Sequence, residues 1–112
     1  MNTYLALDYD NTPITSIKRD INRINEILAC RLHFSIRRSS IRSYHALSMK
    51  PIDYVLARFI LELSNCSEGY KAFVRKQGKF YVRTGDKVKF YRENGKLKRR
   101  VKQEPKFVCV YP

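Results

Sequence analysis

Long apolar runs and a leader segment are both missing from this sequence. Its most apolar stretch, residues 54–63, is interrupted by Arg58 and Glu62, which excludes a membrane-spanning helix. The N-terminus has no basic leader, apolar run or small-residue cleavage site, so we expect no signal peptide. These absences predict an intracellular (cytoplasmic) protein that does not span a membrane.

Closely spaced cysteines are missing as well. Cys30, Cys66 and Cys109 form no CxxC pair, and only His33 of the two histidines lies near one of them. Cys30 and His33 would supply two of the four ligands that a structural zinc needs, so the sequence speaks against a zinc site. With 112 residues, 44% hydrophobic and without internal repeats, the chain predicts one domain spanning residues 1–112.

Acidic residues are scarce: 10 Asp and Glu face 23 Lys and Arg, which gives a net charge of +13. Residues 1–70 hold 9 basic and 7 acidic residues, whereas residues 71–112 hold 14 and 3. Such an imbalance predicts a polyanionic partner, with nucleic acid first and an anionic membrane surface second. The steepest basic run is Lys96, Lys98, Arg99, Arg100 and Lys102. It is expected to bind phosphates, although lysine-rich edge strands also protect sheets against aggregation.

Periodicity divides the first half of the chain into two strand and helix units. Residues 3–10 read as a buried strand, and Asn11-Thr12-Pro13 starts a helix that should end near Cys30. Residues 32–37 and 41–48 alternate as two strands around an Arg38-Ser39-Ser40 turn. A second helix is expected to open at Lys50-Pro51.

The apolar faces of the two helices are expected to form the core. The core residues expected from these faces are Ile17, Ile21, Ile24, Val55, Phe59 and Leu63, and the second face also holds Ile52, Leu56 and Ile60.

The second half of the chain is predicted to be rich in strands. After one or two helical turns near residues 70–74, we expect strands at 79–83, 88–92, 96–102 and 107–111. Turns are expected at Thr84-Gly85-Asp86 and at Asn94-Gly95. The order β-α-β-β-α-β with an extra basic hairpin predicts an α+β, ferredoxin-like or RRM-like split βαβ sheet, in which the first and third strands are neighbours.

Two short motifs lie on those neighbouring strands. Asp8 and Asp10 are two residues apart at the end of the first strand, and Ser43 and His45 are two apart on the third. Paired carboxylates suit Mg²⁺ or Mn²⁺, which would hold triphosphate oxygens, and the imidazole would hold phosphate or transfer a proton. Each motif also has an ordinary interpretation, because an acid before a helix stabilises the helix entry and a lone histidine is often structural.

Basic residues surround this predicted site. Arg37, Arg38 and Arg42 flank the Ser-x-His motif and suit phosphate contacts, although a solvated polar face is an equal interpretation. Arg83, in Tyr81-Val82-Arg83, is a further candidate phosphate contact.

The segment Leu5-Ala6-Leu7-Asp8-Tyr9-Asp10, followed by Ser43-Tyr44-His45, resembles the catalytic half of archaeo-eukaryotic-type primases. That resemblance covers residues 4–49 and implies a reduced relative in which Asp8 and Asp10 bind metal and His45 contacts nucleotide phosphate. It implies a metal-dependent nucleotidyltransferase acting in DNA replication, with nucleic acid and a nucleoside triphosphate as partners. The third motif of the family is an apolar residue followed by an acid, for which Asp86 and Glu93 are the candidates.

Two other function classes remain open. A non-catalytic single-stranded DNA- or RNA-binding module would use Phe80, Tyr81, Phe90 and Tyr91 to stack bases, although Phe80 and Phe90 also suit core packing. A small ferredoxin-like, metal-dependent nuclease would use an Asp at the end of its first strand. A rolling-circle initiator is disfavoured, because the sequence has no His-x-His motif.

Overall fold

The computed structural model describes residues 1–83 and 87–112 of the chain. Helices and strands are mixed along it, which confirms the predicted α+β class. In chain order the elements are β1 (Asn2–Thr3), β2 (Ala6–Tyr9), α1 (Ile14–Leu28), β3 (Phe34–Ser40), β4 (Ser43–Ser48), β5 (Ile52–Asp53), α2 (Tyr54–Leu63), α3 (Glu68–Gln77), β6 (Lys87–Glu93), β7 (Lys96–Lys102) and β8 (Lys106–Tyr111).

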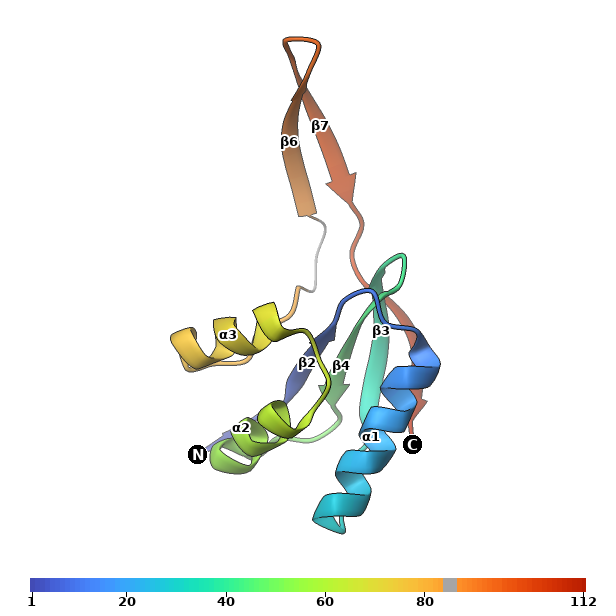
Figure 1. Cartoon of the computed structure of the whole chain (residues 1–112), viewed down its shortest axis with the longest axis vertical. Coiled ribbons are helices and arrows are strands. Elements are labelled where there is room, and N and C mark those ends of the chain that lie inside the picture. The colour runs from blue at the N-terminus through green and yellow to red at the C-terminus, as the bar shows by residue number, and fades with distance from the viewer. Residues whose placement is uncertain (84–86) are drawn as a thin grey trace.

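The central sheet of the described chain contains four strands in the order β2-β4-β3-β8, and each neighbouring pair is antiparallel. β2 and β3 therefore run parallel on either side of β4, and α1 connects them across one face (Figure 1). The expected adjacency of the Asp-x-Asp and Ser-x-His strands is confirmed. The last strand departs from the ferredoxin-like order, in which it would lie beside the first, because β8 pairs with β3 at the opposite edge.

The outer edge of β2 is covered by the segment that starts α3. The Ser67 N–H donates to the Asp8 carbonyl at 2.8 Å, the Tyr70 hydroxyl donates to the Ala6 carbonyl at 2.6 Å, and the Asp10 N–H donates to Ser67 Oγ at 2.8 Å. Burial raises the pKa of the Tyr70 hydroxyl, which keeps it a donor. These bonds occupy two carbonyls of this edge and the N–H of Asp10, so the start of α3 lies where a further strand would pair, and β8 pairs with β3 at the other edge.

α1 forms where the apolar periodicity predicts it. Ile17, Ile21 and Ile24 are fully buried against the sheet, three and four residues apart as one helix face requires. Pro13, expected as the first helical residue, is the N-cap, so the helix begins one residue later at Ile14, and it ends at the left-handed Ala29.

A buried carboxylate joins α1 to β2 and to the residues after α2. Asp20 is 3% exposed and accepts hydrogen bonds from the Tyr9 hydroxyl at 2.8 Å, from Arg23 at 2.9 Å and from the Asn65 N–H at 2.8 Å. Burial, and then the negative charge of Asp20, raise the pKa of Tyr9 far above its ordinary value. This network fixes the helix layer against the strand that carries Asp8.

The second helix differs from its prediction at both its start and its buried face. Ile52 and Asp53 pair with β1 as β5, and the Asp53 carboxylate caps the helix by accepting from the N–H groups of Val55 and Leu56. The helix therefore begins at Tyr54 and not at Lys50-Pro51.

The core face of α2 matches the predicted one only in part. Ala57, Ile60 and Leu61 are fully buried, whereas Phe59 is 55% exposed and Val55 is more exposed still. Of the predicted face, Ile60 and half-buried Leu63 pack in the core. The prediction that Val55 and Phe59 belong to it was wrong, because α2 packs on the neighbouring stripe of its surface that carries Ala57 and Leu61.

The C-terminal part contains a segment that was predicted wrongly and a hairpin that was predicted correctly. Residues 80–83 form no strand, although Phe80 and Val82 pack against the core. The predicted Thr84-Gly85-Asp86 turn lies outside the described residues. β6 and β7 pair over their full length, and Asn94 and Gly95 both have the positive φ of a two-residue hairpin turn. The predicted Arg38-Ser39-Ser40 turn belongs instead to β3, and the chain turns at Ile41 and Arg42.

Candidate nucleic-acid interface and carboxylate–histidine site

Asp8 and His45 face each other on the sheet surface that α1 does not cover. They are direct partners in the register of β2 and β4, and Asp8 Oδ1 lies 3.6 Å from His45 Nε2. The side chain of His45 is 7% exposed and that of Asp8 is 25% exposed. The juxtaposition expected from the two motifs is therefore confirmed, with the imidazole buried and the carboxylate reachable from solvent.

A hollow of about 470 Å³ opens in front of this pair. The sheet contributes one wall, and α3 and the chain that follows it contribute the other. Its lining residues are Asp8, Asp10, Ser39, His45, Gly69, Tyr70, Phe73, Tyr81, Val82 and Arg83. The volume lies within the range of about 300–1,000 Å³ of small-molecule sites.

Asp10 and Ser43 lie beside the pair and have different surroundings. Asp10 is exposed at the rim of the hollow, and its backbone N–H is held by Ser67. Ser43 Oγ accepts from the Asn11 N–H at 3.4 Å, so this serine holds the loop that follows β2. The loop is fixed a second time by the Thr12 N–H, which donates to the Arg42 carbonyl at 2.8 Å.

Among residues 1–83 and 87–112 no three His, Cys, Asp or Glu side chains form a group that could hold a metal ion. Of the two candidates for a third acid, Glu93 lies at the end of β6, where it pairs with Lys98 at 3.4 Å, and Asp86 lies outside the described residues. Asp8 and Asp10 fit Mg²⁺ or Mn²⁺ in one respect, because Mg²⁺ is commonly bound by one or two carboxylates together with substrate phosphates and water.

The four predicted arginine contacts separate into different places. Arg37 is half-buried next to His45 in the register, and Phe107 of β8 is its other neighbour. Arg38 and Arg42 are exposed at the end of β3 and at the following turn. Arg83 lines the hollow and donates to the Gln103 carbonyl at 2.7 Å and to the Ser39 carbonyl at 3.1 Å, which ties the base of the hairpin to β3.

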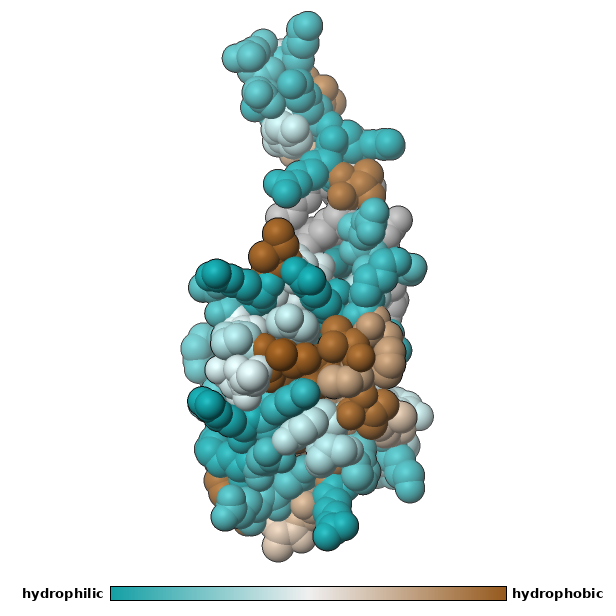
Figure 2. Space-filling view, turned by 90° about the vertical axis from the view of Figure 1, so that its right-hand side faces the viewer, coloured by the Kyte–Doolittle hydropathy of each residue, from teal (hydrophilic) through white to brown (hydrophobic). Residues whose placement is uncertain are grey.

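The predicted basic run lies on a hairpin that projects from the sheet and helices (Figure 1). Residues 87–102 carry 8 Lys and Arg and one Glu. Lys96, Lys98, Arg99 and Arg100 are exposed, and Lys102 is the last residue of β7. Figure 2 shows the hairpin as a mostly hydrophilic projection. Phe90 on β6 is 66% exposed.

The aromatic candidates divide between the hairpin and the core. Phe90 and Tyr91 stand exposed on the hairpin, and Tyr81 is exposed at the rim of the Asp8–His45 hollow. Phe80 is half-buried with its ring centroid 6.3 Å from that of Tyr54, so it has the packing role that was its alternative interpretation.

A second hollow, of about 550 Å³, lies where the hairpin meets the β3–β4 turn. Its lining residues are Arg38, Ser39, Ser40, Ile41, Arg100, Val101, Gln103, Glu104 and Lys106. Sequence reasoning missed it, because these residues come from separate segments that only the fold brings together.

Comparison of the chain with known protein families, with curated proteins and with solved structures finds no match. Within the described residues, no helix has both the length and the apolar character needed to cross a bilayer.

Proposed function

We propose that this protein binds nucleic acid through its projecting hairpin. The observation that carries the proposal is the concentration of 8 basic residues and one acid in residues 87–102. Glu93 is the one acid of residues 87–102, and it pairs with Lys98 at 3.4 Å. A polyanion that lies along these strands would release counterions from several phosphates, which is the main source of non-specific affinity for nucleic acid.

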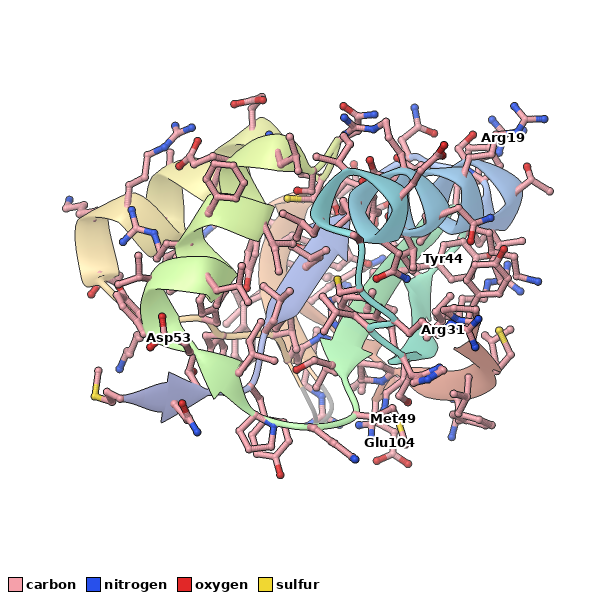
Figure 3. The ribbon with its side chains drawn as sticks, turned by 90° about the horizontal axis from the view of Figure 1, so that it is seen from below. Arg19, Arg31, Tyr44, Met49, Asp53 and Glu104 are labelled. Atoms are coloured by element: carbon pink, nitrogen blue, oxygen red, sulfur yellow. The ribbon has the colours of Figure 1, made fainter. Side chains whose placement is uncertain are left out.

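The experiment is a titration of wild type and a Lys96→Ala, Lys98→Ala, Arg99→Ala variant with labelled oligonucleotides over a range of salt concentrations. Three lost phosphate contacts should reduce the slope of log affinity against log salt by about 2–3 units. The control removes three exposed cations from the helices and loops: Arg19, Arg31 and Lys76. Arg19 projects from α1 on the side opposite Glu104 (Figure 3). Equal slopes in wild type and the hairpin variant would contradict the proposal.

A second candidate function concerns the carboxylate–histidine site. The segment β2-α1-β3-β4 supports a ferredoxin-like, RRM-like half, because β4 lies between two parallel strands. Asp8 and His45, 3.6 Å apart, support the metal-and-phosphate roles that the resemblance to archaeo-eukaryotic-type primases implies. On this hypothesis Asp8 and Asp10 hold Mg²⁺ or Mn²⁺ with a nucleoside triphosphate, and the enzyme would be a metal-dependent nucleotidyltransferase.

Calorimetry with a nucleoside triphosphate, with and without Mg²⁺ or Mn²⁺, tests this second candidate. Wild type should bind the triphosphate more tightly with metal, because a cation reverses the repulsion between two carboxylates and a polyphosphate. Asp8→Asn with Asp10→Asn should abolish that dependence, and His45→Ala should weaken triphosphate binding while the dependence on metal remains. Equal affinity for the triphosphate with and without metal would contradict the nucleotidyltransferase hypothesis, and only the nucleic-acid-binding module would remain. Metal-dependent cleavage of an oligonucleotide would identify the nuclease alternative.

A further inference from the structure

The second hollow has the chemistry of an anion site. Arg38 comes from β3, Arg100 from β7 and Lys106 from β8, so three elements each bring a cation to its wall. Glu104 is the only acid among the lining residues that the structure describes, and it lies 3.6 Å from Lys106. The described lining residues therefore carry a net charge of +2, and the hydroxyls of Ser39 and Ser40 add hydrogen-bonding groups suited to phosphate oxygens.

The same hollow has apolar walls that a phosphate alone would not need. Ile41 stands 80% exposed at the β3–β4 turn, and Val101 is exposed at the end of the hairpin. Neither residue packs against the buried core. An aliphatic side chain left in water at a cationic hollow fits a ligand that is part anion and part flat apolar ring.

We propose that this hollow binds one nucleotide unit of a single-stranded nucleic acid, with the phosphate at Arg38, Arg100 and Lys106 and the base against Ile41 and Val101. The inference rests on the proposed nucleic-acid binding and adds the form of the ligand. A duplex keeps its bases paired and stacked, whereas an unpaired base of a single strand enters such a hollow without the cost of breaking a base pair.

This second hollow is a neighbour of the hollow in front of Asp8 and His45. Ser39 lines both this hollow and the one in front of Asp8 and His45. Arg83, which also lines the second of these, donates to the Ser39 carbonyl at 3.1 Å. A strand that is held by the hairpin and that places one base beside Ile41 would therefore continue toward the carboxylate–histidine pair.

The experiment measures binding of the full chain, at one fixed salt concentration, to an oligothymidine of about 12 nucleotides, to an abasic strand of the same length and to a duplex of the same length. Ile41→Ala should weaken binding to oligothymidine about three- to tenfold, the loss that removal of one apolar contact gives, and should leave binding to the abasic strand unchanged. The matched control is Val55→Ala, which shortens an exposed aliphatic residue on α2 and should change neither affinity. Arg38→Ala with Lys106→Ala should lower the affinity for both oligothymidine and the abasic strand.

Three results would overturn the inference. They are equal affinities of wild type and Ile41→Ala for oligothymidine, equal losses on oligothymidine and the abasic strand, and tighter binding of wild type to the duplex than to the single strand. In each of these cases the proposed nucleic-acid binding stands. Failure of wild type to bind any of the three probes would overturn both proposals together.

Discussion

At the scale of single residues, Asp8 and His45 face each other 3.6 Å apart, and the buried carboxylate of Asp20 accepts hydrogen bonds from three donors. Asp8 and His45 were found because residues two apart on a strand share a face, and their strands were expected to be neighbours. The burial of Asp20 was not predicted, because nothing in a helical sequence distinguishes a buried aspartate from an exposed one. Its three partners come from β2, from α1 itself and from the residues after α2, and only packing assembles them.

A prediction at this scale concerns Tyr9. Tyr9→Phe should lower the free energy of unfolding at pH 7 by about 1–2 kcal/mol, because Asp20 loses one of its donors. The raised pKa of Tyr9 means that the folded state keeps this proton where the unfolded chain releases it. Its contribution is therefore fully present below the ordinary tyrosine pKa of about 10 and is lost as the pH rises above that value.

Denaturant titrations at neutral and at strongly alkaline pH measure both effects. Wild type should lose stability between the two conditions, and Tyr9→Phe should lose less. Tyr4→Phe is the control, because Tyr4 is exposed and should leave the wild-type pH dependence intact. The same alkaline loss in wild type and Tyr9→Phe would show that Tyr9 is not the responsible group.

At the scale of elements, local patterns predicted most helices and strands. They failed where a helix has apolar residues on more than one side. The apolar periodicity of α1 is strong, and its isoleucines are buried as expected. α2 is apolar on more than one side, so the sequence could not decide which side faces the sheet. β5 pairs with β1 and the helix begins at Tyr54, and the packed stripe is that of Ala57, Ile60 and Leu61, which leaves Phe59 exposed.

The two faces of α2 give a direct test. Phe59→Ala should lower the free energy of unfolding by less than about 1 kcal/mol, as exposed substitutions do. Ile60→Ala, one residue further along, should cost about 2–5 kcal/mol, because Ile60 is fully buried and its removal leaves a cavity. Thermal or chemical unfolding of the two variants provides the comparison. A larger loss for Phe59→Ala than for Ile60→Ala would mean that Phe59, and not Ile60, is the packed side chain.

At the scale of the whole molecule, charge and core are kept in separate parts. The buried cluster belongs to the sheet, the helices and the residues up to 82, together with half-buried Cys109 and Tyr111 of β8. The steepest basic charge lies on the projecting hairpin, in a chain with principal extents of 55 × 29 × 20 Å (Figure 1). Self-repulsion among the cations is weaker when they lie on an extended arm than when they are packed over a compact surface.

The α+β class, the central helix, the basic hairpin and the adjacency of Asp8 to His45 were all determined by the sequence itself. Each depends on local periodicity, on turn chemistry such as Asn94-Gly95, or on charge counted along the chain. The tertiary structure alone decided that β8 pairs with β3, that Asp20 is a buried hub and that a cationic hollow lies beside Ile41. These features depend on which edge is already covered and on contacts between distant segments. Local sequence patterns carry no information about either.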